Sequence, residues 1–198
     1  MSTKDMLAPE VEGVGALTLL IAEHSQCQWT AISGQPMLNS NVQPEVLKKA
    51  LMDVRERYHL DIPEEEVDRV VLHLADNPTP QEVTELFFRK VNLFGQVLRS
   101  VVVIATKHFE IEPSSRVNRG STIHDLIWDG DCCPTGEVFE FGVFMDKVCH
   151  ELGVQASFEE RSNLDTYLAA NPTIYDIVKW VMKKIHENER QRGAQVAA

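Results

Sequence analysis

The chain lacks any hydrophobic run long enough to cross a membrane as a helix. Its longest apolar stretches are residues 15–22, which Thr18 interrupts, and residues 101–105, whereas a spanning helix needs about 20 apolar residues. The N-terminal residues MSTKDMLAPEVEG hold one lysine, three acidic residues and no continuous apolar core, unlike a secretory signal or an Arg-rich transit peptide. These absences predict a cytoplasmic protein that has no membrane partner.

Basic residues are also scarce, with 19 Lys and Arg against 30 Asp and Glu, for a formal net charge of −11. Such a chain repels a phosphate backbone at long range, and its few basic residues form no continuous stripe. This charge argues against nucleic acid as a partner. A protein partner with a basic docking surface fits it better.

Cysteine is rare and shows no metal-binding spacing; the four are Cys27, Cys132, Cys133 and Cys149. A reducing cytosol would keep them as free thiols. The sequence Asp-Gly-Asp-Cys-Cys offers two carboxylates and two thiols to a metal ion, but no C-x₂-C or H-x₃-H pair accompanies it. The seven histidines are dispersed. We therefore expect no metal site.

What the chain does have is an internal repeat. Residues 74–91 align without a gap with residues 168–185, at an offset of 94 given by Asn77 and Asn171. Asn-Pro-Thr recurs intact in both segments. Further upstream, residues 19–22 resemble residues 102–105 at an offset of 83. Self-similarity of this kind predicts two tandem copies of one structural unit.

Hydrophobic spacing within each copy predicts an all-helical unit. We expect a first unit at 1–92, a second unit at 93–187, only residues 92–94 between them, and a frayed polar tail at 188–198. Each unit is predicted to contain a first helix, a long loop, a second helix, a short third segment and a last helix. The expected ranges of the first three of these helical elements are 14–27, 44–59 and 64–74 in one copy and 93–109, 134–152 and 158–168 in the other.

Several residues mark where these helices begin. Pro44 and Pro134 suit a first turn, where the missing N–H costs nothing. Asn-Pro-Thr opens the last helix of each copy. There Thr79 or Thr173 can cap the free N–H groups, and the acidic residue three positions later completes a capping box.

The order of elements and two motifs resemble the acyl carrier protein family. Residues 125–131, Asp-Leu-Ile-Trp-Asp-Gly-Asp, lie where that family has D-L-G-x-D-S-L, and residues 171–178 resemble its entry into the last helix. The resemblance covers about 93–185 in the second copy and, without the motif, about 14–91 in the first. It implies two tandem four-helix acyl-carrier-like bundles.

In that family the motif serine carries phosphopantetheine, but here Gly130 occupies its position and has no hydroxyl. Ser121 and Thr135 are misplaced, and Ser33 and Ser40 of the first copy lack the Asp-Ser-Leu context. The sequence is similar to a bacterial group of acyl-carrier-like proteins of unknown function with Asp-Gly-Asp at this site. The resemblance therefore implies no cofactor, and residues 125–134 are expected to be the loop that distinguishes the two copies.

The acidic start of the second helix is the surface that partner enzymes of carrier proteins recognise. The resemblance thus assigns a protein-binding role to Asp125, Trp128, Asp129, Gly130 and Asp131. We expect a non-enzymatic protein–protein interaction module with no catalytic residue. One alternative is a carrier or accessory protein of fatty-acid or polyketide-type synthesis that is modified at another hydroxyl.

A second alternative is a thiol-dependent enzyme that uses Cys132 or Cys133, for which a Cys133/His124/Asp125 arrangement can be written. The nearby aromatic residues Phe139, Phe141, Phe144 and Trp128 are expected in the core rather than in a ligand pocket. Phe139 and Phe141 are two apart and cannot share one helix face. One of them should therefore be exposed or lie between the units.

Overall fold

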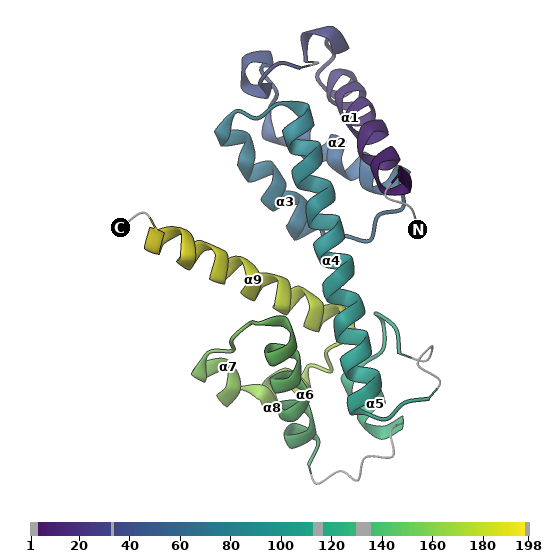
Figure 1. The fold of residues 1–198 in the computed structure, drawn as a ribbon, viewed down its shortest axis with the longest axis vertical. Coiled ribbons are helices and arrows are strands. Elements are labelled where there is room, and N and C mark those ends of the chain that lie inside the picture. The colour runs from purple at the N-terminus through teal and green to yellow at the C-terminus, as the bar shows by residue number, and fades with distance from the viewer. Residues whose placement is uncertain (1–3, 33, 113–116, 130–135, 197–198) are drawn as a thin grey trace. The chain divides into compact units, whose positions relative to one another are not determined.

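The computed structural model describes residues 4–32, 34–112, 117–129 and 136–196, with the side chains of 4–13, 29, 129 and 192–196 left out. Within these ranges all regular secondary structure is helical (Figure 1), which confirms the all-α fold class. Thr122 and Thr173 form one isolated antiparallel bridge. No helix of the described part is long and apolar enough to cross a membrane.

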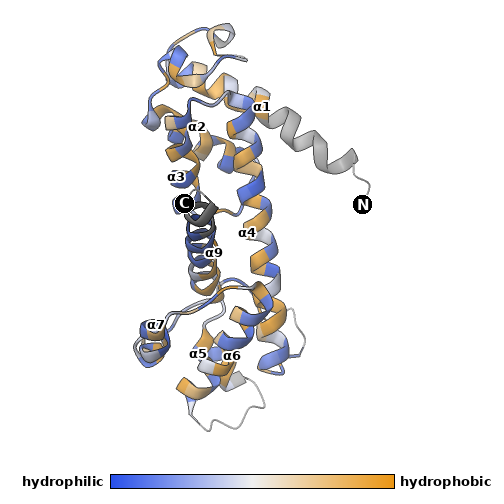
Figure 2. Ribbon diagram, turned by 60° about the vertical axis from the view of Figure 1, so that its left-hand side comes forward, coloured by the Kyte–Doolittle hydropathy of each residue, from blue (hydrophilic) through white to orange (hydrophobic). Residues whose placement is uncertain are grey.

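The chain divides into two compact units, Met1–Gly95 and Gln96–Ala198. The boundary falls inside one continuous helix, α4 (Pro80–His108). Residues 92–94, expected to connect the units, are part of this helix. The buried residues Phe87, Phe94, Val97 and Val101 continue one apolar face through the boundary, and Figure 2 shows apolar and polar residues alternating in bands along α4.

Unit 1 packs its helices around one apolar core. Its elements before α4 are α1 (Lys4–His24), the short 3₁₀ helices η1 (Trp29–Ala31) and η2 (Met37–Ser40), α2 (Pro44–Arg57), α3 (Glu64–Leu72) and η3 (His73–Asp76). Leu17 and Ile21 of α1, Leu47 and Leu51 of α2, and Phe87 of α4 are almost fully buried in this core. Pro44 opens α2 at its first turn, as its position in the sequence predicts.

In its described residues, unit 2 consists of the second half of α4 and five further helices. These are α5 (Ile123–Asp129), α6 (Glu137–Leu152), α7 (Phe158–Ser162), α8 (Leu164–Ala169) and α9 (Ile174–Val196). Phe109, Phe141, Phe144, Ile177 and Val181 are fully buried. The expected third segment, 158–168, is thus two short helices.

Both Asn-Pro-Thr turns have the same local structure, and both expected capping boxes are confirmed. Glu82 accepts hydrogen bonds from the N–H and hydroxyl of Thr79 at 2.7 and 3.0 Å. Asp176 accepts the corresponding bonds from Thr173 at 3.0 and 2.8 Å. Glu82 and Asp176 in turn donate their N–H groups to the two threonine hydroxyls, at 3.3 and 3.2 Å.

The backbone around these turns also matches. Asn77 and Asn171 both adopt left-handed backbone angles, with φ of 54° and 48°, a conformation that Asn tolerates better than most residues. The Pro78 carbonyl accepts a hydrogen bond from Met37 N–H, and the Pro172 carbonyl accepts one from Ile123 N–H, each at 2.9 Å. The same contact therefore joins each turn to the segment before the second helix.

The ends of α1 and α4 correct the upstream register. Gln26 and Glu110, which follow these helices, have φ of 54° and 53°. Directly after them, Cys27 N–H bonds to Ala22 O at 3.0 Å and Ile111 N–H bonds to Thr106 O at 3.1 Å. These pairs differ by 84 positions (110 minus 26), so the offset of 83 was one residue too small. Two short apolar segments can be aligned in several registers with similar resemblance. Directly after this helix, a residue with left-handed backbone angles occurs at one position in each copy and so fixes the alignment.

Two expectations about irregular segments were wrong. Residues 125–129 are not loop but belong to α5, because Ile123, Leu126 and Ile127 place one apolar face inward. The expected frayed tail begins at residue 188, yet α9 continues as a helix to Val196. Its residues are mostly Glu, Arg, Gln and Ala, which propagate a helix that is already nucleated.

Candidate functional site

Helix α5 presents polar and aromatic side chains outward. Its residues Ile123, Leu126 and Ile127 are buried, while His124 and Asp125 on the other side are exposed. Trp128 is 60% exposed, which is high for a side chain that usually buries most of its surface. The outward side of α5 therefore combines a carboxylate with a large apolar ring.

The first turn of α6 also carries exposed apolar side chains. Val138 is 43% exposed and Phe139 is 64% exposed. The His124 Nε2 atom lies 3.6 Å from Glu137 Oε2, so this ring of α5 is close to the start of α6. The His124 and Trp128 rings are 6.1 Å apart. We call the following residues the α5–α6 surface: His124, Asp125, Trp128, Glu137, Val138 and Phe139.

Only part of the partner-binding set named from the sequence can be placed. Asp125 and Trp128 lie on the exposed side of α5, and Asp129 is its last residue, with a side chain outside the described set. Gly130, Asp131, Cys132, Cys133, Pro134 and Thr135 also lie outside the described residues, as does Ser33. Helix α6 begins only at Glu137.

The aromatic residues around this region divide between core and surface. Phe141 and Phe144 are fully buried, with ring centroids 6.5 Å apart, whereas Phe139 is exposed. The expectation that either Phe139 or Phe141 is exposed is therefore confirmed. The core assignment was wrong for Phe139 and Trp128, because their positions on α5 and α6 face away from the buried sides of these helices.

The two described cysteines are free, as expected. Burial raises the pKa of the Cys149 thiol above its ordinary value, although the Ala156 backbone opposes that shift. A raised pKa lowers the thiolate fraction and with it the nucleophilicity of Cys149. Among the described residues, no three His, Cys, Asp or Glu side chains are grouped so as to hold a metal ion.

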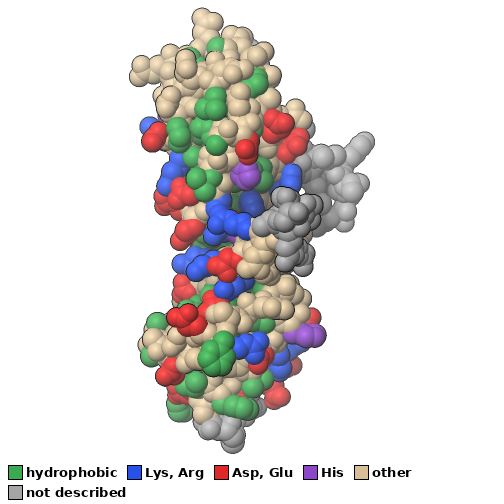
Figure 3. Space-filling view, turned by 90° about the vertical axis from the view of Figure 1, so that its left-hand side faces the viewer, with side chains coloured by type: hydrophobic (Ala, Val, Ile, Leu, Met, Phe, Trp, Pro, Cys, Tyr) green, Lys and Arg blue, Asp and Glu red, His purple; other side chains and the backbone are tan. Residues whose placement is uncertain are grey.

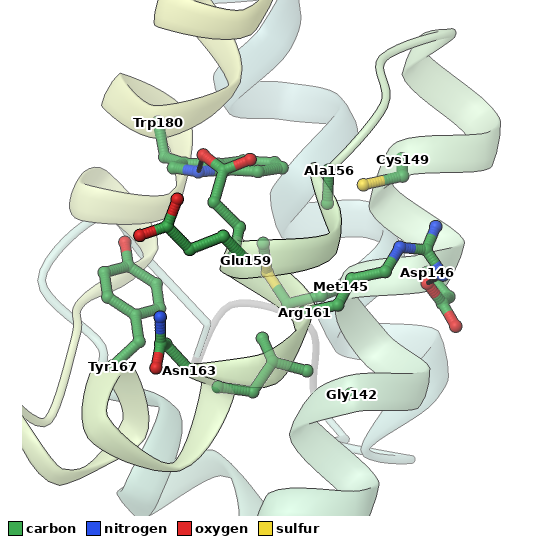
Figure 4. Close-up of a pocket in the computed structure, with 12 residues that line it drawn as sticks. Gly142, Met145, Asp146, Cys149, Ala156, Glu159, Arg161, Asn163, Tyr167 and Trp180 are labelled. Carbon is green, nitrogen blue, oxygen red and sulfur yellow. Dashed lines mark hydrogen bonds and ion pairs between the residues drawn. The ribbon is translucent and has the colours of Figure 1, made fainter.

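Unit 2 also contains a pocket of about 380 Å³ that the sequence did not predict. Figure 4 shows Gly142, Met145 and Cys149 of α6 on one side and Tyr167 and Trp180 on the other. Ala156 and Leu164 complete its apolar wall, and polar residues at its edge are Asp146, Glu159, Glu160, Arg161 and Asn163. Its residues come from α6, the segment that follows it, α7, α8 and α9.

Hydrogen bonds of Glu160 connect α7, on one side of this pocket, to α9. Its Oε1 atom accepts hydrogen bonds from Trp180 Nε1 at 3.1 Å and Lys184 Nζ at 2.9 Å. Its Oε2 atom accepts one from Ser157 N–H at 2.8 Å, within a capping box. Burial opposes ionisation of Glu160, but the bonds from Lys184, Ser157 and Trp180 outweigh it and lower the pKa to about 2. Glu160 is therefore a carboxylate at neutral pH.

A second cavity, of about 570 Å³, lies between α4 and α6 and is bordered by Arg99, Lys107 and Lys147. Beside it, the Lys147 ammonium is 2.9 Å from His108 Nδ1, and His108 Nε2 is 3.1 Å from the Glu140 carbonyl. Burial lowers the pKa of His108, and the Lys147 charge lowers it further, while the hydrogen bond to the Glu140 backbone opposes the shift. His108 is therefore neutral at pH 7.

The exposed position of Trp128 left no clear signal in the sequence, because a helix of seven residues is too short to show a clear period. The pocket left no signal either, because its lining comes from four helices and a connecting segment. Comparison of the chain with family models, with curated proteins and with solved structures finds no match.

Proposed function

We propose that this chain is a non-enzymatic protein-binding module built from two acyl-carrier-like bundles that arose by duplication. The duplication is supported by the paired capping boxes and by the left-handed Asn77 and Asn171, which are 94 positions apart. The proposal that neither unit carries a prosthetic group rests on Gly130, which stands where the resemblance places the modified serine.

The α5–α6 surface is the proposed binding site, and the exposure of Trp128 is the observation that carries this assignment. Partly exposed Trp side chains are frequent hot spots of protein interfaces. Val138 and Phe139 are further exposed apolar residues, and Asp125 and Glu137 are acidic residues on the same two helices. On the face drawn in Figure 3, acidic side chains are spread among hydrophobic and basic ones. The proposed partner is a protein with an apolar spot bordered by Lys or Arg.

Site-specific photo-cross-linking in cells tests this assignment. A photoreactive phenylalanine analogue replaces Phe139 in one variant and Leu72, a 68% exposed residue of unit 1, in a control. We expect one protein to cross-link at position 139 and not at position 72. No cross-linked protein at 139, or the same products from both positions, would overturn the assignment.

The cross-linked protein is then purified and its affinity measured at several salt concentrations. We expect Asp125→Lys to weaken binding at least about tenfold, and added salt to weaken the wild-type complex, because the attraction is between opposite charges. Charge reversal at Asp129 and Asp131 should abolish binding. Unchanged affinity in these variants refutes an acidic docking surface.

Intact mass distinguishes this function from a carrier function. The chain is co-expressed with a phosphopantetheinyl transferase, together with a known carrier protein that confirms transferase activity. We expect the mass of this chain to stay that of its sequence. An added phosphopantetheine arm would show that another hydroxyl is modified and that the chain is a carrier.

A further inference from the structure

The pocket of unit 2 has the size and composition of a small-molecule site. Ligand pockets have volumes of about 300–1,000 Å³ and are mostly apolar, with a few polar groups that orient the ligand. This pocket, at about 380 Å³, is at the small end of that range. Met145, Leu164, Tyr167 and Trp180 provide aliphatic and aromatic contacts for an apolar body.

The charged groups at its edge are mainly negative. Asp146, Glu159 and Glu160 contribute three carboxylates, and Arg161 contributes the one cation among the lining residues. Arg161 Nη1 lies 3.2 Å from Asp146 Oδ1, and Lys184 Nζ lies 2.9 Å from Glu160 Oε1, so these four charges are paired. Glu159 is then the lining carboxylate that can face a cationic ligand. Burial raises the pKa of Tyr167 to about 12, which leaves this phenol neutral.

We propose that this pocket binds a small amphipathic molecule with an aromatic or alkyl body and one positive charge. The body contacts the rings of Tyr167 and Trp180, and the cation lies toward Glu159 at the edge. None of the pocket residues belongs to the α5–α6 surface, so this site does not depend on the proposed protein-binding function.

The corresponding place in unit 1 already contains a cation of the chain itself. At the offset of 94, Gly142 of α6 corresponds to Lys48 of α2. The Lys48 ammonium lies 2.7 Å from both Glu64 and Asp68 and thus crosses from α2 to α3. Gly142 has no side chain that could cross from α6 in the same way. The groove of unit 2 therefore stays open beside acidic groups.

Gly142 also provides a means to close the pocket. A Cβ atom at this position would lie 3.5 Å from Leu164 Cδ1, an ordinary van der Waals contact. Since Gly142 is inside a helix, a larger residue there has better helix propensity than glycine. We expect Gly142→Leu to fold and to place its side chain in the pocket.

Nuclear magnetic resonance titration of the full chain tests the proposal with three matched probes. These are 2-(1-naphthyl)ethylamine, the corresponding alcohol, and 1-naphthylacetate, which share a ring system and differ in charge. The indole N–H of Trp180 is observed, because it lies at the pocket and donates to Glu160. We expect the amine to shift this resonance with an affinity at least about tenfold above that of the carboxylate.

Two variants and a control complete the test. Gly142→Leu should reduce amine binding at least about tenfold, whereas Gly15→Leu, on an exposed position of α1 with open space around it, should not. Glu159→Gln should reduce the preference for the amine over the alcohol without changing the pocket volume, which keeps the test valid if Gly142→Leu does not fold. The proposal is overturned if no probe shifts Trp180, if the carboxylate binds as well as the amine, or if Glu159→Gln leaves the preference unchanged.

Discussion

Replacing Glu160 by alanine should destabilise unit 2, because this carboxylate bonds to Ser157, Trp180 and Lys184. The substitution removes the capping bond to Ser157, which is worth about 1 kcal/mol. It also removes the hydrogen bonds from Trp180 and Lys184, and bonds to a charged group contribute about 1.5–3 kcal/mol. In this variant Lys184 still has Glu187 as an ion-pair partner at 2.8 Å, so its positive charge remains paired. We expect a loss of about 2–4 kcal/mol in the free energy of unfolding.

The assay is urea unfolding, monitored by tryptophan fluorescence. Both the wild-type residue and the Glu160→Ala variant are measured in a protein that also carries Trp29→Phe and Trp128→Phe. Trp180 is then the only tryptophan and reports on unit 2. The matched control is Glu159→Ala, since Glu159 is an exposed neighbour in the same helix and should change stability by less than about 0.5 kcal/mol. A similar small loss for Glu160→Ala would refute the role assigned to this carboxylate.

The low pKa of Glu160 predicts that the stability of the chain depends on pH. The pKa of Glu160 is about 2 in the folded chain against an ordinary value of 4.5, so between these values the unfolded state binds more protons. Stability should therefore fall as pH decreases from about 4.5 to about 2. Glu160→Gln should show a smaller decrease over this window. An equal decrease in both proteins would contradict the lowered pKa.

Three further predictions concern single residues. Thr79→Ala and Thr173→Ala should each cost about 1 kcal/mol of stability, measured by urea unfolding, because each threonine caps a helix; no change in either would contradict its capping box. Gly142→Ala should stabilise the chain by about 0.5–1 kcal/mol in the same assay, as should Gly15→Ala; a loss at Gly142 alone would mean that its surroundings cannot accept a methyl group. His108 should titrate below 6.5 by NMR, and its burial as a neutral ring should reduce stability as pH falls below 6.5; a higher pKa would contradict that.

Sequence reasoning identified those features that depend on local chemistry. The capping residues Thr79 and Thr173 were identified correctly because a cap needs one side chain at a fixed distance from its own helix. The helical fold class followed from hydrophobic spacing in the same way. The first turn at Pro44 was correct for a comparable local reason, the fixed φ of proline.

Features that depend on packing were missed. Helix α5 was expected to be a loop, because a seven-residue segment is too short to show a clear period, and packing of Ile123 and Leu126 stabilises it. Trp128 was assigned to the core together with the nearby phenylalanines, while its position opposite these buried residues leaves it exposed. The pocket beside Gly142 could not be predicted, since it requires knowing which four helices meet there.

The central claim, a protein-binding surface on α5 and α6, is tested most directly by the affinity of Trp128→Ala for the protein cross-linked at Phe139. A Trp at the centre of an interface contributes at least about 2 kcal/mol, or about a 30-fold change in Kd. We predict a loss of this size for Trp128→Ala and unchanged affinity for Leu72→Ala. A Kd for Trp128→Ala within about twofold of the wild-type value would contradict the claim.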